Sequence, residues 1–157
     1  HPPRHERRRL GQTAHAAHYA GAYLRTCEVA VTVLILIIAA LAGLLHVFIF
    51  TLESFRWEEA GTRRSFGTTA EQAAMTRHLA YNQGFYNLFL AITAFAGIAL
   101  AFWPPVSTAL LVVSLGSMLA AAVVLVSSDR TKLRAAAIQG TLPLIGLVLL
   151  AVRALQG

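Results

Sequence analysis

Residues 29–50 read VAVTVLILIIAALAGLLHVFIF, an apolar run that no charged residue interrupts. A helix of this length extends about 33 Å, and the hydrocarbon core of a bilayer is about 30 Å thick. A polar segment of 28 residues precedes the run, and the run is too long for the apolar part of a secretion signal. It therefore predicts a membrane span rather than a cleaved leader.

Three further apolar runs are long enough to cross a membrane. They lie at about residues 79–103, 106–126 and 135–152 of a chain that is 57% hydrophobic and only 13% charged. Short connections join the last three runs, which places sequential helices antiparallel. The sequence predicts an all-α, multi-pass integral membrane protein. Its one membrane domain, residues 28–157, is expected to be an up-down-up-down bundle of four transmembrane helices.

Residues 1–27 form a basic N-terminal tail that is rich in arginine and histidine. The chain carries a net charge of +6, and we expect this tail to lie beside anionic membrane lipid or the acidic surface of a partner. The single Cys27 excludes an internal disulfide. No nucleic-acid partner is expected, because no soluble domain is present to read a groove.

The first connection, residues 51–78, is the only long one, and it ends with a helix-start signal. Thr68 pairs with Glu71 and Thr69 with Gln72 in two overlapping capping boxes, which predict a helix from about Thr69 that continues into the second span. The first and third connections share one side of the membrane and hold seven of the 13 Lys and Arg residues. The other side holds six, of which Arg4 and Arg7 count less because they are far from a span, so the distribution favours a cytoplasmic location for both connections, with both termini outside.

Polar side chains interrupt three of the four spans at a similar depth. His46 lies inside the first run, Glu53 follows seven residues later, and Gln139 lies inside the fourth run. The string Tyr81-Asn82-Gln83-Gly84-Phe85-Tyr86-Asn87 opens the second span. Such groups are costly in hydrocarbon unless they face protein, water or a ligand. All of them lie near the membrane side that carries the first and third connections.

Helical spacing places several of these residues on common faces. His46 and Glu53 are close to two turns apart, so they share a face if the first helix continues past Phe50. The polar residues of the second span follow four-residue spacing in two adjoining rows. We therefore predict one intramembrane polar pocket. Besides His46 and Glu53, its predicted lining residues are Trp57, His78, Asn82, Gln83, Tyr86, Asn87 and Gln139.

Each of these residues also has a structural interpretation. Intramembrane Asn and Gln often hydrogen bond between helices, at roughly 0.6–2 kcal/mol per contact, and Gly84 suits a close approach of two helices. A metal site formed by His46, Glu53 and His78 is a weaker alternative, because no His-x-x-x-His or Glu-x-x-His pair lies within a span. We expect neither a metal nor a cofactor.

The pattern over about residues 29–155 resembles a small bacterial membrane family, domain of unknown function 1304. The residues that carry the resemblance are Gly43-Leu44-Leu45-His46, Leu52-Glu53-Ser54-Phe55-Arg56-Trp57, Phe66-Gly67, Asn82-Gln83-Gly84-Phe85-Tyr86-Asn87, Gln139-Gly140 and Pro143. The family's members begin close to the first span, so the basic tail departs from their pattern. The resemblance implies a bacterial inner-membrane protein and the fold above, and it implies no reaction.

One functional hypothesis is a binder of, or enzyme for, a lipid-like or isoprenoid-like hydrophobic molecule. His46 and Glu53 would form an acid–base pair, since a carboxylate can position and tune an imidazole. The amides of residues 82, 83 and 87 would hold a polar head group, and Tyr86 or Gln139 would stabilise developing charge. Isomerisation, cyclisation or epoxide opening would suit these groups.

The alternative hypothesis is a non-catalytic accessory or structural subunit of a larger membrane complex, in which the polar residues join helices. A proton or small-solute carrier is a third interpretation, and four short helices could form such a path only as a homo-oligomer. The sequence contains no inverted repeat that would support a carrier.

Overall fold

The computed structural model describes the backbone of residues 4–156 and the side chains of residues 21, 23 and 25–155. The chain forms two compact units, His1–Leu34 and Ile35–Gly157. Helix α1 (Arg4–Phe55) begins in the first unit, where its described side chains at residues 25–30 are exposed. The Arg and His side chains of the predicted basic tail, up to His18, lie outside the described side chains.

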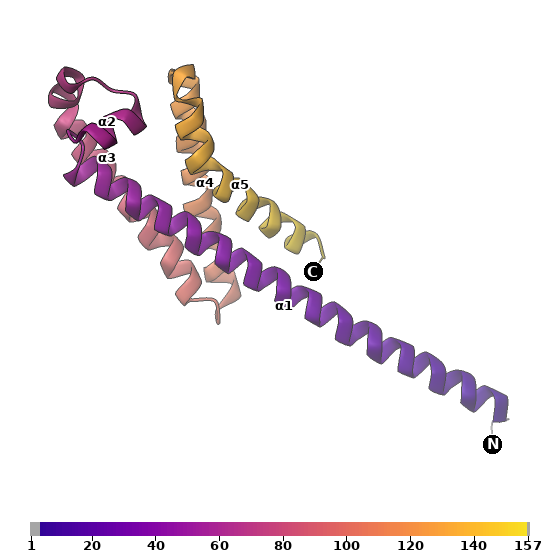
Figure 1. The fold of residues 1–157 in the computed structure, drawn as a ribbon. Coiled ribbons are helices and arrows are strands. Elements are labelled where there is room, and N and C mark those ends of the chain that lie inside the picture. The colour runs from indigo at the N-terminus through magenta and orange to yellow at the C-terminus, as the bar shows by residue number, and fades with distance from the viewer. Residues whose placement is uncertain (1–3, 157) are drawn as a thin grey trace. The chain divides into compact units, whose positions relative to one another are not determined.

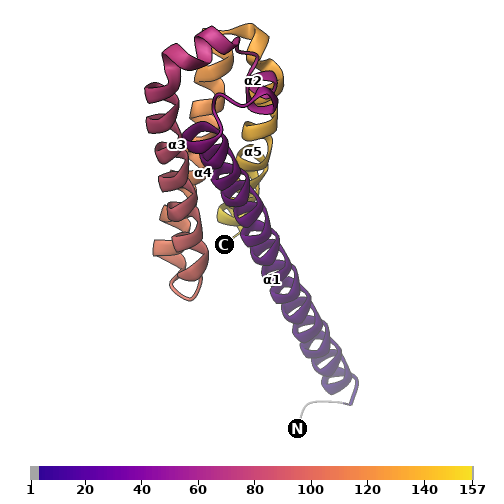
Figure 2. The ribbon, with the colours of Figure 1, turned by 60° about the vertical axis from the view of Figure 1, so that its left-hand side comes forward.

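The second unit is built from the end of α1 and four further α-helices. They are α2 (Ala60–Phe66), α3 (Ala70–Ala99), α4 (Pro104–Ser128) and α5 (Leu133–Gln156), and the 3₁₀ helix η1 (Arg130–Lys132) precedes α5. Residues 4–156 contain no strand, which confirms the all-α prediction for this part of the chain. Figures 1 and 2 show these helices, with α4 and α5 side by side.

The helix starts follow the local signals in the sequence. Thr69 caps α3: its side chain accepts from the backbone N–H of Gln72, and the Gln72 side chain accepts from the backbone N–H of Thr69. The predicted capping box and the uninterrupted helix through the Asn-Gln-Gly string are thus confirmed. Gly67 ends α2 with a φ of 60°, a conformation that glycine adopts without strain.

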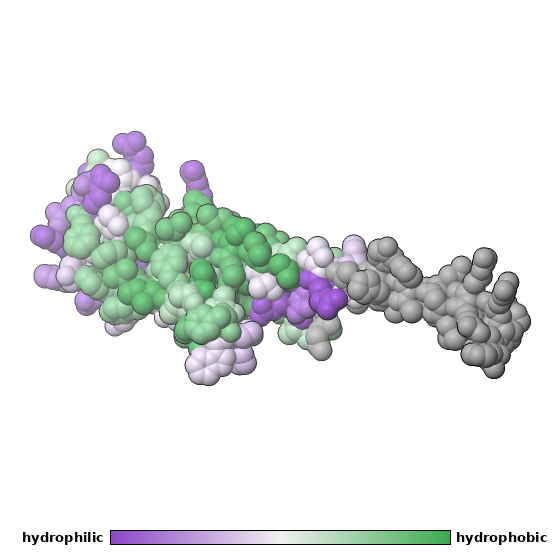
Figure 3. All heavy atoms as spheres, turned by 90° about the horizontal axis from the view of Figure 1, so that it is seen from below, coloured by the Kyte–Doolittle hydropathy of each residue, from purple (hydrophilic) through white to green (hydrophobic). Residues whose placement is uncertain are grey.

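Among the described residues, three helical segments are long and apolar enough to cross a membrane: Arg25–Phe55, Pro104–Ser128 and Arg130–Leu155. The predicted second span lies in α3, which is not among these three. The amides and phenols of residues 81–87 lower its hydropathy. Figure 3 shows apolar residues covering one face of the second unit, with hydrophilic residues gathered at the end that carries α2. The helical, membrane-like character of the protein is therefore clear.

Small residues bring the helices of the second unit close together. A Cβ atom on Gly43 would lie 2.9 Å from the Phe95 ring, so α1 and α3 touch there. The Ser107 hydroxyl donates to the Gly97 carbonyl at 2.7 Å and joins α4 to α3. Added Cβ atoms on Gly140 and Gly146 would meet α4 at 2.9 and 2.7 Å. Close backbone approach of this kind is typical of helices packed in membranes.

Candidate functional site

A hydrogen bond between Glu53 and Asn87 joins α1 to α3 below the protein surface. The Asn87 side chain donates to Glu53 Oε2 at 2.7 Å and to the Gln83 carbonyl at 3.2 Å. Both residues are buried, with exposed fractions of 8% for Glu53 and 7% for Asn87. The continuation of α1 to Phe55, on which the shared site depended, is confirmed.

His46 is fully buried, and its two ring nitrogens have different surroundings. Nδ1 lies 2.9 Å from the Ala42 carbonyl, an acceptor, so Nδ1 carries the proton. Nε2 is left as an acceptor without a hydrogen-bond partner among the described residues. Glu53 follows His46 by seven positions along the helix, a rise of about 10 Å. The described partner of the Glu53 carboxylate is accordingly Asn87 and not the imidazole.

At Gly84 the backbones of α1 and α3 lie close together. A Cβ atom on Gly84 would lie 3.1 Å from the Phe50 carbonyl oxygen and from the Ser54 nitrogen, and it would collide with the Ser54 hydroxyl. The Ser54 hydroxyl donates to the Tyr81 carbonyl at 3.2 Å. The glycine in the polar string therefore permits the close packing that brings Glu53 to Asn87.

Trp57 and His78 lie beside a shallow hollow next to this contact. The Trp57 ring N–H donates to the Thr76 hydroxyl at 3.2 Å, and the ring packs edge-on against Phe66 at a centroid distance of 5.1 Å. Together with Glu53, these two residues line a hollow of about 880 Å³ at the end of α1. His78 is exposed there.

The other predicted residues of α3 point elsewhere. Asn82, Gln83 and Tyr86 are exposed, and none of them lines this hollow or the groove between α1, α2 and α5. The structure thus brings Glu53 and Asn87 into contact, groups Glu53 with Trp57 and His78, and separates the three exposed side chains from them. Gln139 lies on α5, in a different groove.

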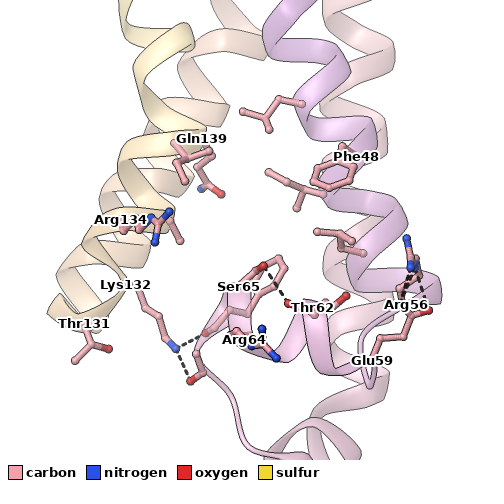
Figure 4. Close-up of a pocket in the computed structure, with 18 residues that line it drawn as sticks. Phe48, Arg56, Glu59, Thr62, Arg64, Ser65, Thr131, Lys132, Arg134 and Gln139 are labelled. Carbon is pink, nitrogen blue, oxygen red and sulfur yellow. Dashed lines mark hydrogen bonds and ion pairs between the residues drawn. The ribbon is translucent and has the colours of Figure 1, made fainter.

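This second groove, of about 930 Å³, lies between α1, α2 and α5, and we call it the α1–α5 groove (Figure 4). Its walls are apolar: Leu45, Phe48, Ile49 and Leu52 on α1, and Ala135 and Ile138 on α5. Short helix α2 closes the end nearest the connections, and the half-buried Gln139 side chain lies between the walls.

The end of the groove nearest α2 is strongly cationic. Its charged lining residues are Arg56, Glu59, Arg64, Lys132 and Arg134. Arg56 forms an ion pair with Glu59 at 2.7 Å, and the hydrogen bond from Arg56 lowers the pKa of the Glu59 carboxyl below its ordinary value. The Lys132 ammonium donates to the carbonyls of Phe66 at 2.5 Å and Gly67 at 3.1 Å.

Sequence reasoning missed this groove for a physical reason. Its cationic end forms when the first connection packs against the third. Lys132 contacts Phe66 and Gly67, which precede it in the sequence by 66 and 65 positions. Helical periodicity describes single helices and contains no information on such a contact. The run of Arg63 and Arg64 next to Gly67, together with Arg130, Lys132 and Arg134, was the available signal.

Among the described residues, no three His, Cys, Asp or Glu side chains lie close enough to hold a metal ion. The polar groups that line the two hollows are guanidinium, ammonium, amide, carboxyl, hydroxyl, indole and imidazole groups. Such a set can bind the head group of an amphiphilic molecule.

Over the part of the chain that the structure describes, the protein is all-helical, with three helices long and apolar enough to cross a membrane. Residues 40–151 match the family described as "Protein of unknown function (DUF1304)", and the chain belongs to this family. The match covers the Glu53–Asn87 contact and every residue that lines the α1–α5 groove. No curated protein and no solved structure matches the chain.

Proposed function

We propose that the protein binds a lipid-like amphiphile in the α1–α5 groove, at the boundary between the hydrocarbon core and the head groups. The observation that carries this proposal is the division of the groove into apolar walls and a cationic end. Lipid molecules have the same division, and an amphiphile that lies along the groove covers both parts.

The membrane arrangement behind this proposal has four spans. Helix α3 has 30 residues and is about 45 Å long, so its first turns can lie outside a hydrocarbon core of about 30 Å. The exposed Asn82 and Gln83 then lie near the head groups, while Phe89 and Ile92 face lipid. At that level water can hydrate the polar side chains of residues 81–87, so their desolvation cost is small. Helix α3 then completes an up-down-up-down bundle.

The geometry favours binding over acid–base chemistry. Neither His46 nor Glu53 lines the α1–α5 groove, and the Glu53 carboxylate is engaged by Asn87. Of the residues predicted for the pocket, only Gln139 lies among those that line this groove. We assign Glu53 and Asn87 to holding α1 against α3, which keeps one wall of the groove in place.

Filling the groove tests the proposal. Ala135→Trp places an indole between the walls, whereas the matched Ala137→Trp places it on an exposed position of the same helix that does not line the groove. We measure binding of a phosphatidylcholine with one fluorescent acyl chain to the full chain in mild detergent. Because the indole occupies the space for the acyl chain, Ala135→Trp should weaken binding about tenfold or more.

Ala137→Trp should bind the fluorescent lipid as the unmodified protein does. Circular dichroism and gel filtration establish that both variants are folded. Equal lipid binding by folded Ala135→Trp and Ala137→Trp would contradict a lipid site in this groove.

A further inference from the structure

The charges at the end of the α1–α5 groove are not balanced within the protein. Arg56 is paired with Glu59, whose two carboxylate oxygens accept from the Arg56 Nε at 3.0 and 2.9 Å. Asp129 is close enough to attract Lys132, and its oxygen accepts from the Thr131 hydroxyl at 2.7 Å. Among the described residues that line this groove, Glu59 is the only acidic one.

Arg64 and Arg134 have no acidic partner among the described residues. Neither guanidinium forms an ion pair or side-chain hydrogen bond with any residue that the structure describes. Arg64 lies on α2 and Arg134 in the first turn of α5, and Figure 4 shows both at the α2 end of the open space. Two unpaired guanidinium groups on different helices thus border one apolar groove.

Lys132 holds these two arginines on either side of the groove. Its bonds to the carbonyls of Phe66 and Gly67 fasten the C-terminal end of α2 to η1. Arg64 lies two residues before Phe66, and Arg134 lies two residues after Lys132. The backbone segments that carry the two arginines are therefore joined by a contact that is made without a ligand, so binding has only the two side chains left to order.

The apolar walls determine what kind of anion fits. From Leu52 to Leu45 the α1 wall extends about 10 Å, and Ile138 lies opposite on α5. A small soluble anion would leave these walls uncovered, whereas a lipid covers them with an acyl chain and places its charge at the end. Guanidinium groups match phosphate oxygens in geometry and bind them with charge-assisted hydrogen bonds.

We propose that the groove selects an acidic glycerophospholipid, with its phosphate between Arg64 and Arg134 and one acyl chain along Phe48. This inference rests on the proposed lipid-binding function and adds the chemical class of the ligand. A zwitterionic lipid gains less in this site, because its own ammonium group opposes the two arginines.

The test compares phosphatidylglycerol with phosphatidylcholine of identical acyl chains. Each lipid is titrated into the full chain in mild detergent, and bound lipid is counted by native mass spectrometry. The unmodified protein should prefer phosphatidylglycerol about tenfold, and the double variant Arg64→Gln/Arg134→Gln should lose that preference because it loses more affinity for phosphatidylglycerol than for phosphatidylcholine. A double variant that keeps the preference would overturn the proposal.

The matched control is Arg63→Gln/Arg130→Gln, which removes the same charge from α2 and η1. Arg63 and Arg130 do not line the groove. If the control loses the preference to the same extent, the attraction belongs to the basic surface in general and the proposed site is wrong. Binding of inorganic phosphate to the unmodified protein as tightly as phosphatidylglycerol would show that the apolar walls add no affinity, and it would overturn the proposal equally.

The two proposals fail in different ways. If Ala135→Trp binds both lipids as the unmodified protein does, the groove is not a lipid site, and both proposals are wrong. A different result is that Ala135→Trp abolishes lipid binding but Arg64→Gln/Arg134→Gln keeps the preference for phosphatidylglycerol. That result would contradict only the assignment of the two arginines to the lipid phosphate.

Discussion

At the scale of single residues, the contact between Glu53 and Asn87 shows what spacing in a sequence can and cannot predict. Spacing and depth predicted that the two side chains belong to one site, and the structure brings them to 2.7 Å. The same spacing grouped Asn82, Gln83 and Tyr86 with them, but those side chains are exposed. Periodicity shows which residues share a face, and only packing determines which face turns inward.

The Glu53–Asn87 contact should contribute measurably to stability. Asn87→Ala removes the donor and leaves a buried carboxyl group without its side-chain partner, so we expect a loss of about 1–3 kcal/mol. Glu53→Gln keeps an oxygen that can accept the same hydrogen bond and should cost less. Unfolding of the full chain in mixed micelles, titrated with denaturing detergent, measures both changes. Equal stability of Asn87→Ala and the unmodified protein would contradict this role.

At the scale of helices, the sequence was most informative where one segment contains its own signals. The capping box at Thr69 and the uninterrupted α3 follow from residues within a few positions of each other. Helix α2 was not predicted, because it has only seven residues and its N-cap, Glu59, makes no side-chain capping bond. Its place depends on Lys132, far away in the chain, so no local pattern reveals it.

The packing of α1 on α3 depends on the absence of a side chain at Gly84. Gly84→Ala introduces a Cβ 3.1 Å from two backbone atoms of α1, which cannot move aside as a flexible side chain would. The helices must separate, and we expect a loss of about 1–3 kcal/mol.

Gly116→Ala is the matched control for this prediction. Nothing lies within 4 Å of a Cβ atom at Gly116 in α4, so alanine there should be neutral or stabilising by up to about 1 kcal/mol. The same unfolding titration compares the two variants. If Gly84→Ala were as stable as Gly116→Ala, a Cβ atom would fit between α1 and α3 at position 84, and the prediction would be wrong.

At the scale of the whole molecule, the α1–α5 groove requires that the first and third connections lie on the same side of the membrane. Lys132 joins these connections directly. Two connections separated by α3 and α4 share a side only if both helices cross or neither does, and α4 is one of the three helices suited to crossing. Where α4 spans, the Lys132 contact therefore predicts that α3 spans as well, despite its polar string.

Cysteine labelling in membrane vesicles checks this arrangement. In a Cys27→Ser background, single cysteines replace Glu71 at the start of α3, Phe102 in the turn after it, and Arg130 in the third connection; all three positions are exposed. A membrane-impermeant maleimide added outside intact vesicles should either label both Glu71→Cys and Arg130→Cys and leave Phe102→Cys unlabelled, or label only Phe102→Cys, depending on the orientation of the vesicles. In detergent-treated vesicles all three thiols should react. Labelling of Phe102→Cys together with Glu71→Cys would mean that α3 does not span, because its two ends would then lie on one side.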